Sequence, residues 1–105
     1  MTSFNERENA FEMEFAHREE LKFKVRERAV ALLARWAAQR LGKPSQAAET
    51  YAREIVALDV ANPTPDATVD RVVADLGPVG VTVQEVRRAM EQFFVQAETS
   101  VRTSA

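Results

Sequence analysis

The sequence predicts an all-α fold, a small four-helix bundle with room for one extra short helix and with a partly mobile N-terminal helix. Apolar residues recur three or four positions apart in successive segments of the chain, which is the period of an amphipathic helix. The three glycines and four prolines fall between these segments, where they break helices. No alternation of useful length predicts a strand. A chain of 105 residues is one ordinary domain, so we expect residues 1–105 to form a single domain.

The first segment is amphipathic, but its apolar side is narrow. Ser3 and Glu6 have the spacing of a capping box, which predicts a helix start. Phe4, Phe11 and Phe15 fall on one side of the helix that follows, and most residues between them are charged. Residues 1–20 contain no leucine, isoleucine or valine. This helix therefore has few anchors for a core.

The second segment has a different apolar phase. Around Glu20 the first stripe stops and another begins, with no glycine or proline between them. A continuous helix with a change of buried face and two helices with a bend are both compatible with this pattern. Gly42 and Pro44 end the second segment, because glycine suits the left-handed position after a helix and proline cannot prolong one. The second stripe consists of Val25, Ala29, Leu32, Leu33, Trp36, Ala37 and Leu41.

Three further helices follow. Ser45 is the expected N-cap of one, Thr64 or Asp66 that of a short one, and Thr82 with Glu85 forms a capping box for the last. We expect residues 98–105 to fray. The predicted inner faces are Ala48, Tyr51, Ala52, Ile55 and Val56, then Val69, Val72, Val73 and Leu76, then Val83, Val86, Met90, Phe93, Phe94 and Ala97.

The composition excludes several kinds of active site. The chain has no cysteine and one histidine, which excludes a disulfide framework, a thiolate metal site and the usual zinc sites. No nucleophile and base form a catalytic set, and the three glycines form no phosphate-binding loop. We therefore predict that the protein is not an enzyme and has no metal and no cofactor.

Charge and hydropathy indicate an intracellular, soluble protein. No apolar run approaches the ~20 residues of a membrane span, and the N-terminus does not resemble a signal peptide. Residues 1–43 carry nine basic and seven acidic side chains, a net +2, and residues 44–105 carry five and nine, a net −4. Neither part has the concentrated basic face of a nucleic-acid-binding protein. We expect a cytoplasmic location, no nucleic-acid partner and no membrane insertion.

Single residues have a functional and a structural interpretation. His17 is the only side chain that titrates near neutral pH, which makes it a candidate pH modulator, although an exposed histidine among charges is the more common case. Trp36 lies in an apolar stripe, so a core position is favoured over ligand stacking. Arg87 and Arg88 are more typical of a solvated pair than of a phosphate site.

The phenylalanine stripe supports two interpretations of the first helix. It could pack on the bundle as a further core helix. It could also bind another protein, because aromatic residues at helical spacing anchor helices in the grooves of their partners. The dense charge and the lack of aliphatic residues favour the second interpretation.

Several of these residues form an ordered pattern that resembles a known family. The pattern reads Phe4-x-x-Arg7-Glu8-x-x-Phe11-Glu12-x-x-Phe15-Ala16, then Leu21-x-Phe23-Lys24, then Leu32-Leu33-x-x-Trp36-Ala37-Ala38-x-x-Leu41-Gly42-Lys43. It is similar to the zeta-subunit family of α-proteobacterial F-type ATP synthases, over essentially the whole chain. Ala34 stands where that family usually has glycine, and Arg28 is the one arginine left where it usually has a pair.

The resemblance implies an inhibitor of ATP hydrolysis. Residues 1–20 would be an inhibitory segment and residues 21–105 a helical bundle. The segment would insert into the catalytic head of the ATP synthase, between its α and β subunits and near γ, at the cytoplasmic face of the inner membrane. The partner-binding positions implied are Phe4, Arg7, Glu8, Phe11, Glu12 and Phe15. The alternatives are a nucleotide-binding bundle that senses ADP or ATP weakly, and a family member without inhibitory activity.

Overall fold

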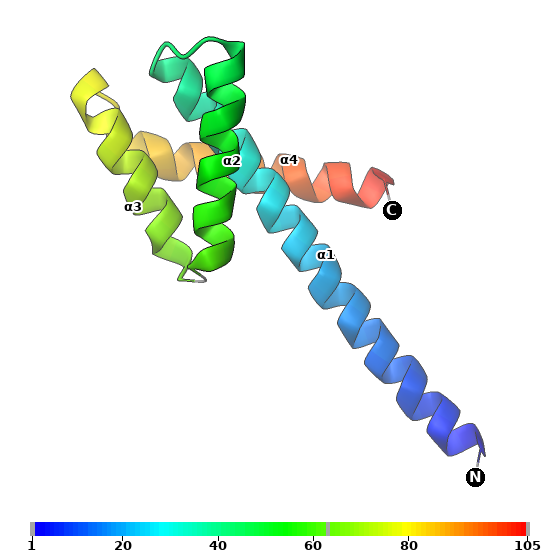
Figure 1. The fold of residues 1–105 in the computed structure, drawn as a ribbon. Coiled ribbons are helices and arrows are strands. Elements are labelled where there is room, and N and C mark those ends of the chain that lie inside the picture. Colours follow the sequence, from blue (N-terminus) through cyan, green and yellow to red (C-terminus); the bar gives the residue numbers. More distant parts are fainter. Residues whose placement is uncertain (1, 63, 105) are drawn as a thin grey trace.

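Figure 1 shows the fold in a computed structural model that describes residues 2–62 and 64–104, with the side chains of residues 16–62, 64 and 66–103. The helices are α1 (Thr2–Arg40), α2 (Ser45–Ala61), α3 (Pro65–Leu76) and α4 (Val83–Ser104), with a 3-10 turn η1 (Gly77–Val79) before α4. These residues contain no strand, and the predicted small all-α bundle is confirmed. No helix among them is both long and apolar enough to cross a membrane.

Helix α1 is one uninterrupted helix of 39 residues. At 1.5 Å per residue it is about 58 Å long, close to the 64 Å longest dimension of the molecule. Its C-terminal half lies within the bundle, and its N-terminal half extends away from the other three helices (Figure 1). Of the two alternatives left by the sequence, the continuous helix is therefore the one observed.

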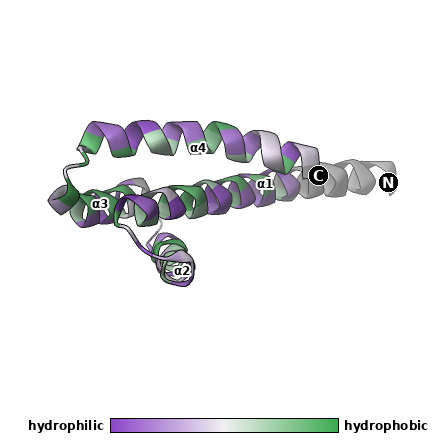
Figure 2. Ribbon diagram, turned by 90° about the horizontal axis from the view of Figure 1, so that it is seen from above, coloured by the Kyte–Doolittle hydropathy of each residue, from purple (hydrophilic) through white to green (hydrophobic). Residues whose placement is uncertain are grey.

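The bundle is built in layers around α1. Helix α4 packs on one side of α1 and α2 packs on the opposite side (Figure 2). Helix α3 follows α2 and also contacts both α1 and α4. Because α1 is covered from two directions, its C-terminal half needs two apolar faces.

The predicted apolar stripe accounts for only one of these faces. Ala29, Leu33 and Ala37 are fully buried as expected. Val30, Ala34 and Ala38 are also fully buried, although they lie outside the predicted stripe. Alanine is small enough to let helices approach closely. The remaining buried apolar residues are Tyr51, Ala52, Ile55, Val72, Leu76, Val86, Ala89, Met90, Ala97 and Val101.

The turn between α1 and α2 follows the predicted chemistry, with one correction. Gly42 adopts φ +71°, and the amide of Lys43 donates to the carbonyl of Ala38 at 3.0 Å, as in the Schellman ending of a helix. Ser45 is not the N-cap. That position belongs to Pro44, whose side chain makes no capping bond, because the extended conformation of Pro44 lets the helix begin at Ser45 itself.

The start of α4 agrees with the capping box, whereas the predictions for Val83 and for the tail were wrong. The amide of Glu85 donates to Oγ1 of Thr82 at 3.2 Å. Val83 is 46% exposed, since it lies one turn before the first residue of α4 that is buried. Residues 98–104 stay helical instead of fraying, because Ala97 and Val101 are buried on α1 and hold the last turns.

Candidate functional site

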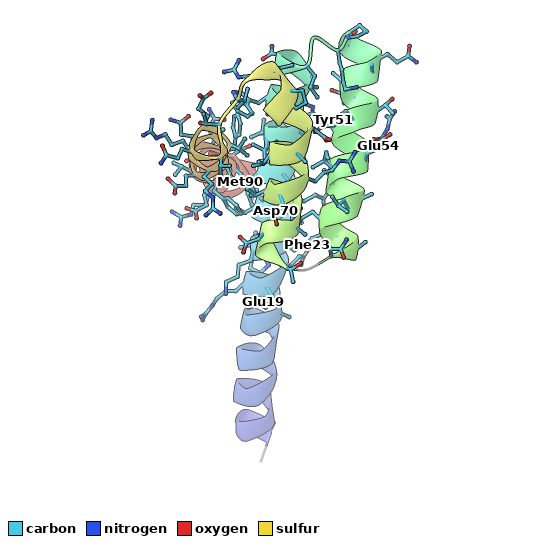
Figure 3. All side chains as sticks on the ribbon, turned by 90° about the vertical axis from the view of Figure 1, so that its left-hand side faces the viewer. Glu19, Phe23, Tyr51, Glu54, Asp70 and Met90 are labelled. Carbon is cyan, nitrogen blue, oxygen red and sulfur yellow. The ribbon has the colours of Figure 1, made fainter. Side chains whose placement is uncertain are left out.

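The N-terminal part of α1, residues 2–20, forms an arm that extends beyond the bundle. Its backbone is helical throughout, and the side chains of residues 16–20 are all exposed. In Figure 3, Glu19 lies on the part of α1 that has already passed the ends of α2 and α3. All five side chains are thus open to solvent, and Arg18 also lines a groove with the end of α4.

The predicted partner-binding residues all belong to the arm. Their six positions lie on one continuous helical backbone, which brings them into a single element. Their side chains lie outside the described residues, so their roles stay predictions. The six are Phe4, Arg7, Glu8, Phe11, Glu12 and Phe15.

His17 is the one predicted site residue whose side chain is described. It is exposed on the arm, among exposed neighbours that include Arg18 and Glu19. None of the described side chains gives it a hydrogen bond or an ion pair. This is the exposed histidine that the sequence favoured, and a role as pH modulator stays a prediction.

Burial rises steeply where the arm joins the bundle. Leu21, Val25 and Arg26 are half-buried, and Ala29 is the first fully buried residue of α1. Two exposed ion pairs lie at this junction, Lys22 with Glu19 and Lys24 with Glu20, each at 3.3 Å. Pairs three or four residues apart stabilise a helix by about 0.2–0.5 kcal/mol each.

A cluster around Asp59, consisting of Arg26, Asp59 and Thr68, fixes the root of the arm to the bundle. Arg26 of α1 donates from Nε to Oδ2 of Asp59 at 2.9 Å and from Nη2 to Oδ1 at 2.7 Å. Thr68 of α3 donates to Oδ1 of Asp59 at 2.7 Å. Asp59 is only 8% exposed and Thr68 is fully buried. The Asp59 cluster thus ties three helices together where the arm leaves them.

The charge of Asp59 is favoured by its partners. Burial by itself would raise the pKa of the Asp59 carboxyl, but the hydrogen bonds from Arg26 and Thr68 outweigh it, and the pKa lies below its ordinary value. The bond to Asp59 in turn raises the pKa of Arg26. The pair is therefore ionised at neutral pH. A bidentate arginine–carboxylate pair also fixes direction, so the cluster holds the root of α1 in a set orientation.

The sequence analysis missed this cluster, although one signal was present. Asp59 follows Ile55 by four residues and Tyr51 by eight, so it continues the apolar face of α2. An aspartate on such a face requires a buried partner. The identity of that partner depends on how α1 and α3 pack, which spacing along the chain does not contain.

A second polar group joins α2 to α3. The hydroxyl of Tyr51 donates to Oδ2 of Asp75 at 2.8 Å, and Arg71 donates from Nε to the same oxygen at 2.9 Å. Burial and the bond to Asp75 raise the pKa of the Tyr51 hydroxyl. Tyr51 is 5% exposed, so this phenol is a structural donor in the core.

Trp36 and the arginines of α4 have structural surroundings. Trp36 is half-buried against the core, and the Arg40 guanidinium lies 4.7 Å from the centre of its ring, which is cation–π distance. Arg87 and Arg88 are exposed, as expected. No group of three or more potential ligands lies close enough to hold a metal ion among the described residues.

A basic cleft of about 590 Å³ lies along α1 and bears on the nucleotide alternative. Its cations already have partners on the protein, and a phosphate would have to displace them. Their bonds are Lys24–Glu20, Arg35–Glu49 and Arg28–Ser100. The nucleotide alternative stays a prediction.

The whole chain, arm and bundle together, agrees with one known family. The family model described as ATPase inhibitor subunit zeta matches residues 1–100. The chain belongs to this family. No curated protein and no solved structure matches the chain. The family description is that of a regulatory subunit, which is consistent with the prediction that this zeta-family chain is not an enzyme.

Proposed function

We propose that the protein inhibits ATP hydrolysis by the F-type ATP synthase, and that its arm is the inhibitory element. The observation that carries the proposal is the arm itself. In a chain of the ATPase inhibitor family, a helical segment with three phenylalanines extends beyond the bundle. The arm inserts into the catalytic head between an α and a β subunit, near γ. The partners are thus the three subunits α, β and γ.

The dimensions of the chain support insertion by the arm alone. The 19 residues of the arm span about 28 Å as an α-helix. A single helix, side chains included, is about 10–12 Å across. The whole molecule measures 25 by 21 Å across its shorter axes. A cleft that admits one helix excludes the bundle, which remains outside and obstructs rotation in the hydrolytic direction.

The residue types of the arm suit a groove between subunits. Phe4, Phe11 and Phe15 would supply the apolar contact area, since aromatic anchors dominate interface energies. Arg7 and the glutamates Glu8 and Glu12 would set orientation and register by charge complementarity. A helix that is already formed pays no nucleation cost on binding.

An assay of ATP hydrolysis with the isolated catalytic head tests the proposal. The full chain should inhibit, and the variant Phe4→Ala/Phe11→Ala/Phe15→Ala should lose most of the inhibition, with at least a tenfold weaker effect for a loss of about 1.4 kcal/mol or more. Phe23→Ala is the matched control, because Phe23 is a 53% exposed phenylalanine of the same helix outside the arm.

Three outcomes decide between the alternatives. No inhibition by the full chain would leave a family member without inhibitory activity. Equal inhibition by the triple variant would move the inhibitory element out of the arm. Equal losses for the triple variant and Phe23→Ala would show that exposed aromatic surface matters in general and that the arm has no special role.

A further inference from the structure

An apolar groove lies where α4 meets the root of the arm. Its floor consists of Leu21 and Val25 of α1 with Phe94 and Val101 of α4, and its volume is about 510 Å³. The three residues Leu21, Val25 and Phe94 are only half-buried. Three basic side chains and one acidic one line the groove, a net charge of +2: Arg18, Lys22, Arg102 and Glu98. Lys22 also pairs with Glu19, but both side chains are exposed, so this pair is weak.

The sequence of this chain contains a segment complementary to the groove. Residues 4–15 include three phenylalanines, and they carry four glutamates against one arginine, a net charge of −3. An apolar floor with a basic rim suits an acidic aromatic helix in both hydrophobic and electrostatic terms. The same chain therefore presents an apolar acidic helix and an apolar basic groove.

The geometry of α1 favours a second copy over the same copy as the occupant. Because α1 is continuous, Phe11 lies ten residues from Leu21, about 15 Å along the axis, and Phe4 lies about 25 Å away. The arm thus leads away from the groove beside its own root. No glycine or proline interrupts residues 2–40, so folding back would cost the helix several hydrogen bonds. A second molecule reaches the groove with its arm intact.

We propose that two copies of the chain pair reciprocally, each seating residues 4–15 of its arm in the α1–α4 groove of the other. Two arms that run antiparallel about a twofold axis near residue 15 bring residues 4–12 of one copy beside residues 18–26 of the other. Such an isologous contact is closed, so it ends at a dimer. Each arm covers the apolar floor of its partner, and the two glutamate-rich segments face the two basic rims.

The pairing has a consequence that rests on the proposed function. A seated arm hides the residues that would enter the catalytic head. The dimer would then be a resting form, and dilution would favour the inhibitory monomer. Self-association itself does not depend on inhibition, so the two proposals fail separately.

A charge-swap experiment followed by sedimentation equilibrium tests the pairing. One variant carries Glu8→Lys and Glu12→Lys in the arm, and the other carries Lys22→Glu and Arg102→Glu at the groove. The native chain should dimerise with rising concentration, and each variant alone should dimerise at least about tenfold more weakly. An equimolar mixture of the two should regain the dimer, because each arm then meets a groove of opposite charge.

The control is Arg87→Glu with Arg88→Glu, which reverses the same number of exposed charges at the other end of α4. This variant should dimerise like the native chain. A native chain that stays monomeric up to millimolar concentration would overturn the proposal. So would a mixture that associates no better than its components.

Disulfide trapping identifies the occupant, since the sequence has no cysteine of its own. Asn9→Cys in one copy and Glu98→Cys in another should form a mixed disulfide dimer on oxidation, and only when the two are combined. The control pair combines Asn9→Cys with Arg87→Cys, which lies outside the groove, and should give far less product. Equal yields from the two pairs would overturn the assigned site.

A chain that carries both Asn9→Cys and Glu98→Cys shows whether the arm in the groove comes from a second copy or from the same molecule. Pairing between copies predicts crosslinked dimers whose yield falls on dilution. A crosslink within the monomer that is independent of concentration would show the arm seated on its own bundle and would overturn the second copy as occupant.

Discussion

The two halves of α1 have the same secondary structure and opposite surroundings. Residues 16–20 are all exposed, whereas Ala29, Val30, Leu33, Ala34, Ala37 and Ala38 are fully buried. The buried half is rich in alanine and is covered by α2 and α4. The sequence of the N-terminal half has isolated aromatics among charges. One helix therefore combines a half that holds the fold with a half whose backbone extends beyond the bundle.

The difference shows how a long helix is stabilised when only part of it packs. Short isolated helices are marginal in water, because nucleation is costly while extension adds one hydrogen bond per residue. The packed half of α1 supplies the nucleus, and the arm extends it. The Asp59 cluster then marks the boundary, since Arg26 is where α1 makes its bidentate bond to α2.

The largest expected effect comes from a truncation in the packed half. Leu33→Ala should lower the free energy of unfolding by about 2–5 kcal/mol, because Leu33 is fully buried and its loss leaves a cavity. Phe11→Ala in the arm should change the same quantity by less than about 0.5 kcal/mol. Urea denaturation of both variants measures the contrast. Similar losses for both would mean that the arm is part of the folded core.

The next effect concerns the boundary between the halves. Asp59→Ala should cost about 1–3 kcal/mol of unfolding free energy, because it leaves Thr68 and Arg26 without their acceptor. Glu49→Ala is the control. It removes an ion pair with Arg35 in which both side chains are about half exposed, and such pairs contribute about 0–1 kcal/mol. Equal costs would show that Asp59 adds no more than a surface pair.

Acid should weaken the Asp59 cluster. The pKa of Asp59 is lower in the folded protein than its ordinary value, so ionised Asp59 stabilises the fold above its unfolded pKa of about 3.9. That contribution is lost as the pH falls from there through the folded pKa. The free energy of unfolding, measured at pH 7 and at pH 3, should change less between the two pH values for Asp59→Asn than for the native chain. An unchanged pH dependence would contradict the assignment.

The smallest effect lies at the base of the arm. Glu20→Gln removes the exposed pair with Lys24 and should cost about 0.2–0.5 kcal/mol of local helix stability. Amide exchange of residues 16–24 should rise slightly, and the exchange of buried amides in α2 and α4 should not change. A rise throughout the bundle would show that the arm and the core are not independent.

Much of the bundle followed from periodicity alone. The apolar stripes predicted α2, α3 and α4, and the capping box at Thr82 predicted where α4 starts. The second buried face of α1 could not be predicted, because Val30, Ala34 and Ala38 become core residues only when a second helix packs on them. Ser45 was misplaced by one position for a local reason, the conformation of Pro44.

The candidate site also has features that the sequence indicated and features that only the structure shows. The dense charge and the narrow phenylalanine stripe of residues 1–20 favoured a partner-binding helix over a core helix. The backbone of residues 2–20 extends beyond the bundle, and the binding role of its side chains stays a prediction. The Asp59 cluster and the apolar groove were not predicted, since each joins residues from helices that are distant along the chain. Features made by tertiary contact require the structure.

The central claim is that the arm, and not the bundle, engages the catalytic head. Hydrogen exchange on the full chain tests it, measured at a concentration where the protein is monomeric, with and without an excess of the F-type catalytic head. The account predicts new protection of amides in residues 2–20 and unchanged exchange in α2, α3 and α4, together with loss of ATP hydrolysis. Inhibition with new protection in the bundle and none in the arm would contradict it.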